Sequence, residues 1–287
     1  MAGKKDFVLK NDLAVKELTR NNHYVPQWYQ KGFTAGSDQL HYLDLSPDQK
    51  KLPDGRIINF NERKLLPPSK CFFEYDLYTT FFGPFISDLI ERHLFGKIDD
   101  EGSRAVRAFI DGDERERHDR FIDFFNYIDT QKTRTPKGLN WLKERYAKLD
   151  QGHLMMEMQA VQKMHCTIWL EGVREVVSAK NSDTKFIISD HPVTVYNYAC
   201  PPESQFCKYP NDPPIAWKAS QTIFPLDKDH CLILTNYEFA SEPNLADPTT
   251  KRTNARNFAE TMVRTNAFLR DRNHLIRQFR LLKQQIF

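Results

Sequence analysis

The chain lacks long hydrophobic runs and any strong excess of charge. A helix that crosses a membrane needs about 18 or more consecutive apolar residues. The most apolar stretch, residues 81–90, is interrupted by glycine, proline, serine and aspartate. Residues 1–22 are charged throughout and do not contain the apolar core and small-residue cleavage site of a secretory signal. We therefore expect a cytoplasmic protein that does not cross a membrane.

Sequence motifs of several common enzyme classes are also missing. The chain contains no GxxxxGK[ST] loop, no GxGxxG turn and no GxSxG elbow. These absences disfavour P-loop ATP hydrolysis, dinucleotide-dependent redox chemistry and serine hydrolysis. The five cysteines are scattered and form no CxxC pair, so neither a disulfide framework nor a cysteine zinc site is indicated. We expect them to be reduced, mostly structural thiols.

The balance of charge excludes a global nucleic-acid-binding field but allows a local basic groove. The chain has 41 basic and 38 acidic residues and a formal charge of +3. Basic residues beside aromatic rings, as in Lys208-Tyr209 and Trp217-Lys218, are compatible with stacking on single-stranded bases. A nucleic acid or nucleotide is therefore a candidate partner, and a protein partner is unspecified.

The 287 residues contain ample apolar surface for a large core, with 40% hydrophobic and 13% aromatic residues. Short apolar runs between turn formers predict a β-hairpin or meander at 40–60. Helical spacing predicts helices at 85–94, 101–110, 113–131, 155–177 and 249–270. The helix at 113–131 is expected on the surface, because one apolar stripe runs along an otherwise charged segment, and the helix at 155–177 is expected in the interior. Buried or continuing strands are expected at 185–189, 193–198, 222–226 and 231–235.

These elements predict one α+β domain over residues 21–287, preceded by an N-terminal extension at 1–20. The helical part would pack on a small mixed or antiparallel sheet. The proline-rich loop at 201–214 is long for a compact domain, which favours a functional or exposed role.

His23 is the first candidate catalytic residue. Pro26 restricts the backbone before it, so the imidazole would be held on a rigid segment, suited to acid–base work or metal binding. Tyr24 and Tyr29 lie close by as candidate substrate-binding residues. A hydrogen-bonded structural role for His23 remains the alternative.

Gln131 and Arg134 lie three residues apart, so on a helix their side chains would share one face. Both are therefore candidate residues for binding the same ligand. The planar guanidinium of Arg134 suits a phosphate or carboxylate. The alternative is a buried arginine that holds backbone carbonyls or the carboxylate of Asp190.

Ser189, Asp190 and His191 follow a predicted strand, at the kind of position where polar groups meet ligands. Asp190 and His191 are candidate catalytic residues and Ser189 a candidate substrate-binding residue. Together with His23 they would supply one carboxylate and two imidazoles, enough for a divalent metal that activates water, although the spacing matches no recognised metal motif. A role of Asp190 in holding the turn before Pro192 is the alternative.

Glu101 is a further candidate general base or second carboxylate. It belongs to an acidic cluster at a helix boundary, where capping of the helix is the alternative role.

Several of these segments carry a family resemblance. His23-Tyr-Val-Pro26, Gln131-x-x-Arg-Thr-Pro136 and the Ser189-Asp-His-Pro-Val193 strand end resemble, in that order, the motifs of a mainly bacterial family known as domain of unknown function 4238. Phe224-Pro-Leu226 and a late helix near Asn254 extend the resemblance over roughly residues 21–267. Gln30, where an aliphatic residue is usual, and the longer 201–214 segment depart from the pattern. The family name implies no activity.

The leading hypothesis is a hydrolase that acts on a phosphate-containing substrate, a nuclease-like effector in bacterial antiviral defence. His23 would be the acid–base group, Arg134 would bind phosphate, and Asp190 would orient a base or a metal. One alternative is a non-catalytic sensor or adaptor in which the same three residues form a buried polar lock. Another is a nucleotide or NAD glycosidase in which Glu101 or Asp190 stabilises a cationic sugar.

Overall fold

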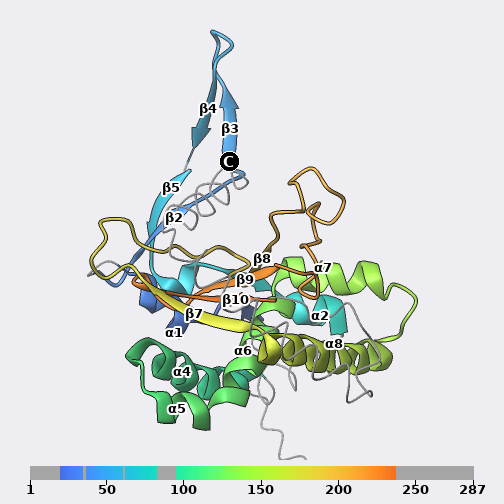
Figure 1. Ribbon diagram of the computed structural model, residues 1–287. Coiled ribbons are helices and arrows are strands. Elements are labelled where there is room, and N and C mark those ends of the chain that lie inside the picture. Colours follow the sequence, from blue (N-terminus) through green and yellow to red (C-terminus); the bar gives the residue numbers. More distant parts are fainter. Residues whose placement is uncertain (1–19, 35–36, 61, 83–94, 237–287) are drawn as a thin grey trace, which may run out of the picture.

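The structure, a computed structural model, describes residues 20–34, 37–60, 62–82 and 95–236 (Figure 1). The predicted helices at 85–94 and 249–270 lie outside the described residues. The described strands are β1 (Asn21–His23), β2 (Leu40–Leu43), β3 (Asp48–Lys51), β4 (Ile57–Phe60), β5 (Arg63–Leu66), β6 (Phe73–Tyr75), β7 (Val173–Ser178), β8 (Thr194–Tyr196), β9 (Gln221–Pro225) and β10 (His230–Thr235). The described helices are α1 (Gln27–Gln30), α2 (Leu77–Phe82), α4 (Gly96–Asp111), α5 (Glu114–Asp119), α6 (Phe121–Thr133), α7 (Pro136–Arg145) and α8 (Gln151–Glu171).

A four-stranded antiparallel sheet with the order β7-β10-β9-β8 forms the centre of the fold. Every residue of β9 and β10 is buried. Both strands are rich in β-branched and large apolar residues, which pack well on a covered sheet. The predicted α+β class and the two predicted strands at 222–226 and 231–235 are confirmed.

Aromatic side chains join this sheet to the helices. Trp169 of α8 donates a hydrogen bond from Nε1 to Thr222 Oγ1 of β9, at 2.9 Å, and lies against Phe125 of α6. The ring of Tyr29 from α1 stacks on Phe224 of β9 with centroids 5.3 Å apart. Since burial of one such side chain contributes roughly 1.5–3 kcal/mol, these rings dominate the core.

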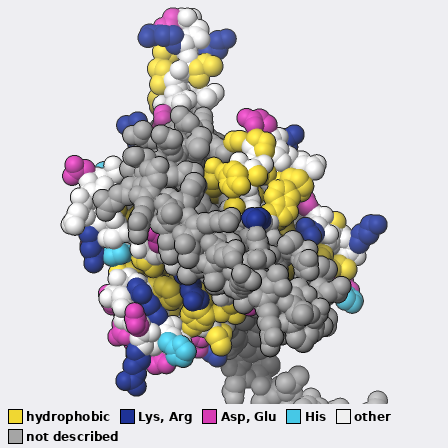
Figure 2. All heavy atoms as spheres, in the orientation of Figure 1, with side chains coloured by type: hydrophobic (Ala, Val, Ile, Leu, Met, Phe, Trp, Pro, Cys, Tyr) yellow, Lys and Arg dark blue, Asp and Glu magenta, His cyan; other side chains and the backbone are white. Residues whose placement is uncertain are grey.

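The predicted hairpin is present as two nested hairpins, because β2 pairs with β5 and β3 pairs with β4. The β3–β4 hairpin projects away from the body (Figure 1), and all eight residues of its two strands are exposed. In Figure 2 its tip carries Lys and Arg side chains, with hydrophobic side chains below them. Ile57 and Phe60 are 63% and 43% exposed. The hairpin therefore adds no buried core to the domain.

The prediction of one helix over 155–177 is wrong at its C-terminal end. α8 ends at Glu171, Gly172 takes an extended conformation, and Val173–Ser178 form β7. β7 pairs with β10 over its whole length, for example Val173 with Thr235. A strand partner distant in sequence therefore overrides the local helical spacing. The helix is not uniformly interior either, since Met164 is 50% exposed.

The 113–131 segment forms two helices, and the second is not a surface helix. α6 buries polar as well as apolar residues, among them Asp129, Gln131 and Thr133. The prediction failed because these polar groups find hydrogen-bond partners inside the protein. Pro136 begins α7 at the first helical position, where its missing N–H is tolerated.

The segment 185–189 was predicted as a buried strand and is not one. It belongs to no sheet, and Ile187 is 64% exposed. Phe186 N donates to Lys228 O at 2.9 Å, so the segment runs beside the turn that joins β9 to β10. A short apolar run alone cannot distinguish such a covering segment from a strand.

Candidate functional site

The end of α6 and the start of α7 join segments that are far apart in sequence. Gln131 donates from Nε2 to the backbone oxygen of Tyr24, 2.9 Å away. Its Oε1 accepts hydrogen bonds from Arg134, from Nε at 3.1 Å and from Nη2 at 2.5 Å. The same glutamine thus holds both the segment at 23–26 and the arginine of its own motif.

Arg134 is buried, with 1% of its surface exposed. Its carboxylate partner is Asp99 of α4, with Nη1 to Oδ2 at 3.1 Å and Nη2 to Oδ1 at 2.9 Å. The rings of Phe95 and Tyr127 lie 5.6 and 5.9 Å from the guanidinium carbon. Burial opposes the charged form, but the nearby charge of Asp99 leaves the pKa of Arg134 above its ordinary value. The guanidinium therefore has its partners inside the protein. Its carboxylate partner is Asp99, whereas the sequence suggests Asp190 for that position.

His191 is held in the same region by Thr135. Its Nδ1 lies 2.7 Å from Thr135 Oγ1, and its backbone N–H donates to Ser189 Oγ at 3.1 Å. Burial lowers the pKa of His191 to about 4, so the ring is neutral at pH 7. Ser189 Oγ thus accepts the backbone N–H of His191 and holds the turn before Pro192.

Asp212, on the long loop, forms the centre of an ion-pair cluster. Lys132 Nζ lies 2.6 Å from its Oδ2 and Lys137 Nζ 2.5 Å from its Oδ1. His191 Nε2 makes a longer contact of 3.4 Å with Oδ2. Although burial opposes its ionisation, the two lysines and His191 hold the pKa of Asp212 well below its usual range. The cluster fixes the loop to α6 and α7.

The other predicted site residues lie outside this network. His23 Nε2 lies 3.3 Å from Ser69 O and faces Phe73, and burial lowers the pKa of His23. Glu101 lies 3.7 Å from Lys97 on the same helix. Asp190 is exposed and is one of the charges that raise the pKa of Tyr24, after burial.

Tyr29 is buried and donates its hydroxyl hydrogen bond to Pro225 O. No hydrogen bond or ion pair joins His23, Arg134 and Asp190 to one another in the described part of the chain. The structure thus brings Tyr24, Gln131 and Arg134 together, and Ser189 and His191 together. Asp190 lies between Ser189 and His191 in the chain and near enough to Tyr24 for its charge to act on that phenol, but it forms no hydrogen bond or ion pair with the other predicted residues among those described. His23, Glu101 and Tyr29 form no such bond with either group there.

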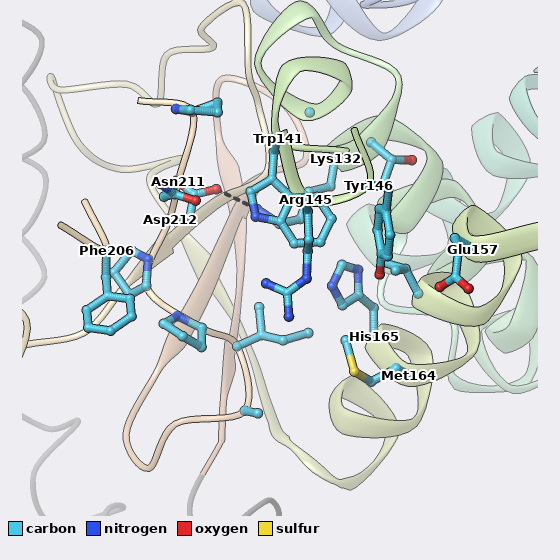
Figure 3. A pocket seen from close by; sticks show the side chains of 18 of the residues that line it. Lys132, Trp141, Arg145, Tyr146, Glu157, Met164, His165, Phe206, Asn211 and Asp212 are labelled. Atoms are coloured by element: carbon cyan, nitrogen blue, oxygen red, sulfur yellow. Dashed lines mark hydrogen bonds and ion pairs between the residues drawn. The ribbon is translucent and has the colours of Figure 1, made fainter. Parts of the chain in front are cut away.

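A cavity of about 720 Å³ lies beside the ion-pair cluster (Figure 3). Side chains of α6, α7, α8 and the 205–216 segment line it. Its charged and imidazole groups are Lys132, Arg145, Glu157, His165, His191 and Asp212, and its aromatic rings are Trp141, Tyr146 and Phe206. Charged groups and aromatic rings in one concave space form the best candidate for a ligand site among the described residues.

His165 and Asp129 form a buried pair at this cavity. His165 Nδ1 lies 2.7 Å from Asp129 Oδ1, and the two side chains are 6% and 5% exposed. With Nδ1–H donated to the carboxylate, Nε2 is the ring nitrogen that remains to accept a proton. Figure 3 shows the imidazole on the same side of the cavity as Arg145 and Tyr146. An imidazole oriented by a carboxylate is an arrangement suited to general base chemistry.

Arg145 supplies an exposed positive charge in the same space. Its guanidinium lies over the indole of Trp141, 5.4 Å from the ring centroid. No acidic side chain of the described residues lies within ion-pair distance of it. In contrast to Arg134, this arginine is available to an anionic ligand.

Sequence reasoning did not select His165, Asp129 or Arg145. Helical spacing alone could have found the first two. Asp129 follows Phe125 by four residues, and His165 lies four residues from both Val161 and Trp169, so each polar side chain falls on an apolar face. Arg145 carries no such signal.

In the described ranges, no three His, Cys, Asp or Glu side chains lie close enough together to hold a metal ion. The divalent-metal hypothesis therefore has no ligand set there. Nor is any helix in these ranges both long and apolar enough to span a membrane.

Comparison with known proteins agrees with the motifs. A family model described as protein of unknown function (DUF4238) matches residues 21–271. No curated protein and no solved structure matches the chain. Since the family model covers most of the 287 residues, the chain belongs to the DUF4238 family.

Proposed function

We propose that the cavity between α7, α8 and the long loop is the active site of a hydrolase that acts on a phosphate-containing substrate, a nucleotide or nucleic acid. The His165–Asp129 pair lies at a cavity that also contains Arg145, which has no ion-pair partner in the described part of the chain, and this is the observation that carries the proposal.

Arg145 is the phosphate-binding group. Its guanidinium has a planar fork that matches two phosphate oxygens, and its contact with Trp141 restricts its orientation. The rings of Tyr146 and Phe206 provide surfaces on which a base can stack. Together these groups fit a ligand that has both a flat ring and an anion.

His165 is the general base. Its Nε2 takes a proton from water as the water oxygen attacks phosphorus, and the bond from phosphorus to the departing oxygen breaks on the opposite side. The departing oxygen takes a proton from solvent, and the imidazolium later returns its proton to solvent. Asp129 keeps Nδ1 protonated and stabilises the imidazolium that forms. The residues first predicted to do this work, His23, Arg134 and Asp190, have no role in this scheme.

The test uses purified full-length protein with RNA, DNA and nucleotides, with and without added Mg²⁺, Mn²⁺ or Zn²⁺. Turnover should fall about 10²–10⁴-fold in His165→Ala, and Arg145→Ala should mainly raise KM. His118→Ala and Arg107→Ala are matched controls, because both residues are exposed and neither lines the cavity. Intact substrates in every condition, or full activity in folded His165→Ala, would overturn the proposal.

A non-catalytic sensor or adaptor is the second candidate. Its favouring observation is that Arg134 is hydrogen-bonded to Gln131 and ion-paired with Asp99 within the protein, although neither His23 nor Asp190, the other expected members of the lock, bonds to it in the described residues. Equilibrium binding of a nucleotide without turnover, lost in Arg145→Ala, would favour this candidate. Release of free base with the phosphate ester intact would instead favour a glycosidase.

A further inference from the structure

Two thiols lie in contact within the long loop. The Sγ atoms of Cys200 and Cys207 are 3.3 Å apart. Cys200 is buried and Cys207 is half-buried. Ser204 N donates to Pro201 O and Cys207 N donates to Ser204 O, both at 2.9 Å, so two successive turns bring the ends of this eight-residue stretch together. The backbone therefore holds the two sulfurs adjacent.

We propose that Cys200 and Cys207 form a redox-active pair that closes into an intramolecular disulfide when the protein meets a peroxide. One thiolate attacks a peroxide oxygen and becomes a sulfenic acid with release of water. The second thiol then displaces the hydroxyl group as water. In balance, two thiols and one hydrogen peroxide give one disulfide and two waters. A disulfide bond is about 2.05 Å long, so the sulfurs need to approach by only about 1.2 Å.

The other three cysteines offer no comparable pair. Cys71, Cys166 and Cys231 are free thiols on separate segments, and no second sulfur lies against any of them in the described residues. Burial and the neighbouring thiol raise the pKa of Cys207, so its thiolate fraction at pH 7 is small and the reaction is slow. Selectivity therefore comes from the proximity of the pair.

A disulfide between Cys200 and Cys207 would constrain a segment that lines the cavity. Phe206, next to Cys207, lines the cavity and packs edge-on against Trp217 with centroids 4.7 Å apart. Five residues beyond Cys207, Asp212 joins the loop to α6 and α7. A disulfide between the two cysteines would hold Phe206 within a closed ring. The redox state of the pair is thus a control on the shape of the cavity, whatever ligand the cavity takes.

The experiment uses full-length protein that has been reduced and freed of reductant. It is incubated for hours with hydrogen peroxide, alkylated with iodoacetamide and digested with trypsin. Cleavage after Lys185 and Lys208 places both cysteines in one peptide, 186–208. We expect this peptide to become two hydrogens lighter and free of label, and to regain two labels after reduction.

Cys71→Ser is the matched control and should keep the change, whereas Cys200→Ser and Cys207→Ser should each abolish it. Circular dichroism of each variant verifies the fold. A peptide 186–208 that stays doubly alkylated, that gains only oxygen atoms, or that links to a second chain would overturn the proposal. Because no enzyme assay enters, the result is independent of the proposed hydrolase activity.

Discussion

Thr135 Oγ1 lies 2.7 Å from His191 Nδ1, so the residue before Pro136 is tied to the residue before Pro192. Thr135 Oγ1 also accepts the N–H of Gly138 as the cap of α7, and it lies 3.5 Å from the backbone oxygen of Lys132. The other ring nitrogen, Nε2, lies 3.4 Å from Asp212 Oδ2. The loop cluster and the helix junction thus meet at one neutral imidazole.

The buried ion pair of Arg134 predicts a large loss of stability without it. Arg134→Ala should lower the free energy of unfolding by about 3–5 kcal/mol, because it leaves the half-buried carboxylate of Asp99 without its cation and the buried Oε1 of Gln131 without a donor. Chemical denaturation measures this, with exposed Arg107→Ala as the control. Loss of activity at unchanged stability would show that Arg134 contacts a ligand instead.

Neutral burial of His191 predicts a pH dependence of stability. The folded pKa of about 4 lies below the ordinary 6.5, so the unfolded chain takes up a proton first as the pH falls. Stability due to this group is complete above pH 6.5 and is lost progressively toward pH 4. Between pH 7.5 and 5 the loss should be about 2 kcal/mol.

His191→Gln should remove that part of the slope, and denaturation curves at the two pH values give the difference. Asp212 stays ionised across this range because its pKa lies well below its usual value. An equal loss of stability in the wild type and in His191→Gln would contradict the assignment.

The sequence predicts the class and much of the fold, because periodicity reports local burial. The strands β9 and β10 and the helix α4 follow directly from their apolar spacing. The end of α8 at Glu171 does not, since pairing with β10 decides it. The spacing of apolar residues within a segment cannot show that the segment pairs with a strand about 60 residues away.

In the candidate site, too, the sequence predicts local features but not contacts between distant segments. Polar residues beside Pro26, Pro136 and Pro192 stand out in the sequence, and they do meet, but as internal hydrogen bonds. Asp129 and His165 come from two helices, 36 residues apart, and only packing shows that they form a pair. A motif near a proline marks a rigid junction at least as well as it marks a reaction centre.

The pairing of Asp129 with His165 predicts a loss of turnover when the carboxylate becomes an amide. Asp129→Asn should lower kcat about 10²–10⁴-fold, because the amide no longer fixes Nδ1–H or stabilises the imidazolium. Asp123→Asn, on a less buried part of the same helix, is the control. Equal kcat in both variants would remove His165 from the proposed mechanism.

The close approach of α6 and α7 at Gly138 predicts that any side chain there destabilises the protein. A Cβ at this position would lie 2.2 Å from Lys132 O and 2.7 Å from Thr133 O, both backbone atoms. Gly138→Ala should therefore cost about 1–3 kcal/mol of unfolding free energy, the usual range for overpacking. Exposed Glu144→Ala on α7 should change it by less than about 0.5 kcal/mol. A tolerated Gly138→Ala would mean that the junction can separate.

The exposed β3–β4 hairpin predicts that the domain folds without it. Asp44 N donates to Glu62 O at 2.8 Å, so the ends of the hairpin are already adjacent. Replacement of residues 45–61 by Asn-Gly, which favours a two-residue turn, should keep β2 and β5 paired. Because every residue of β3 and β4 is exposed, the free energy of unfolding should change by less than about 1 kcal/mol. Thermal and urea unfolding of the shortened chain measure this, and a larger loss would show that the hairpin packs on the domain.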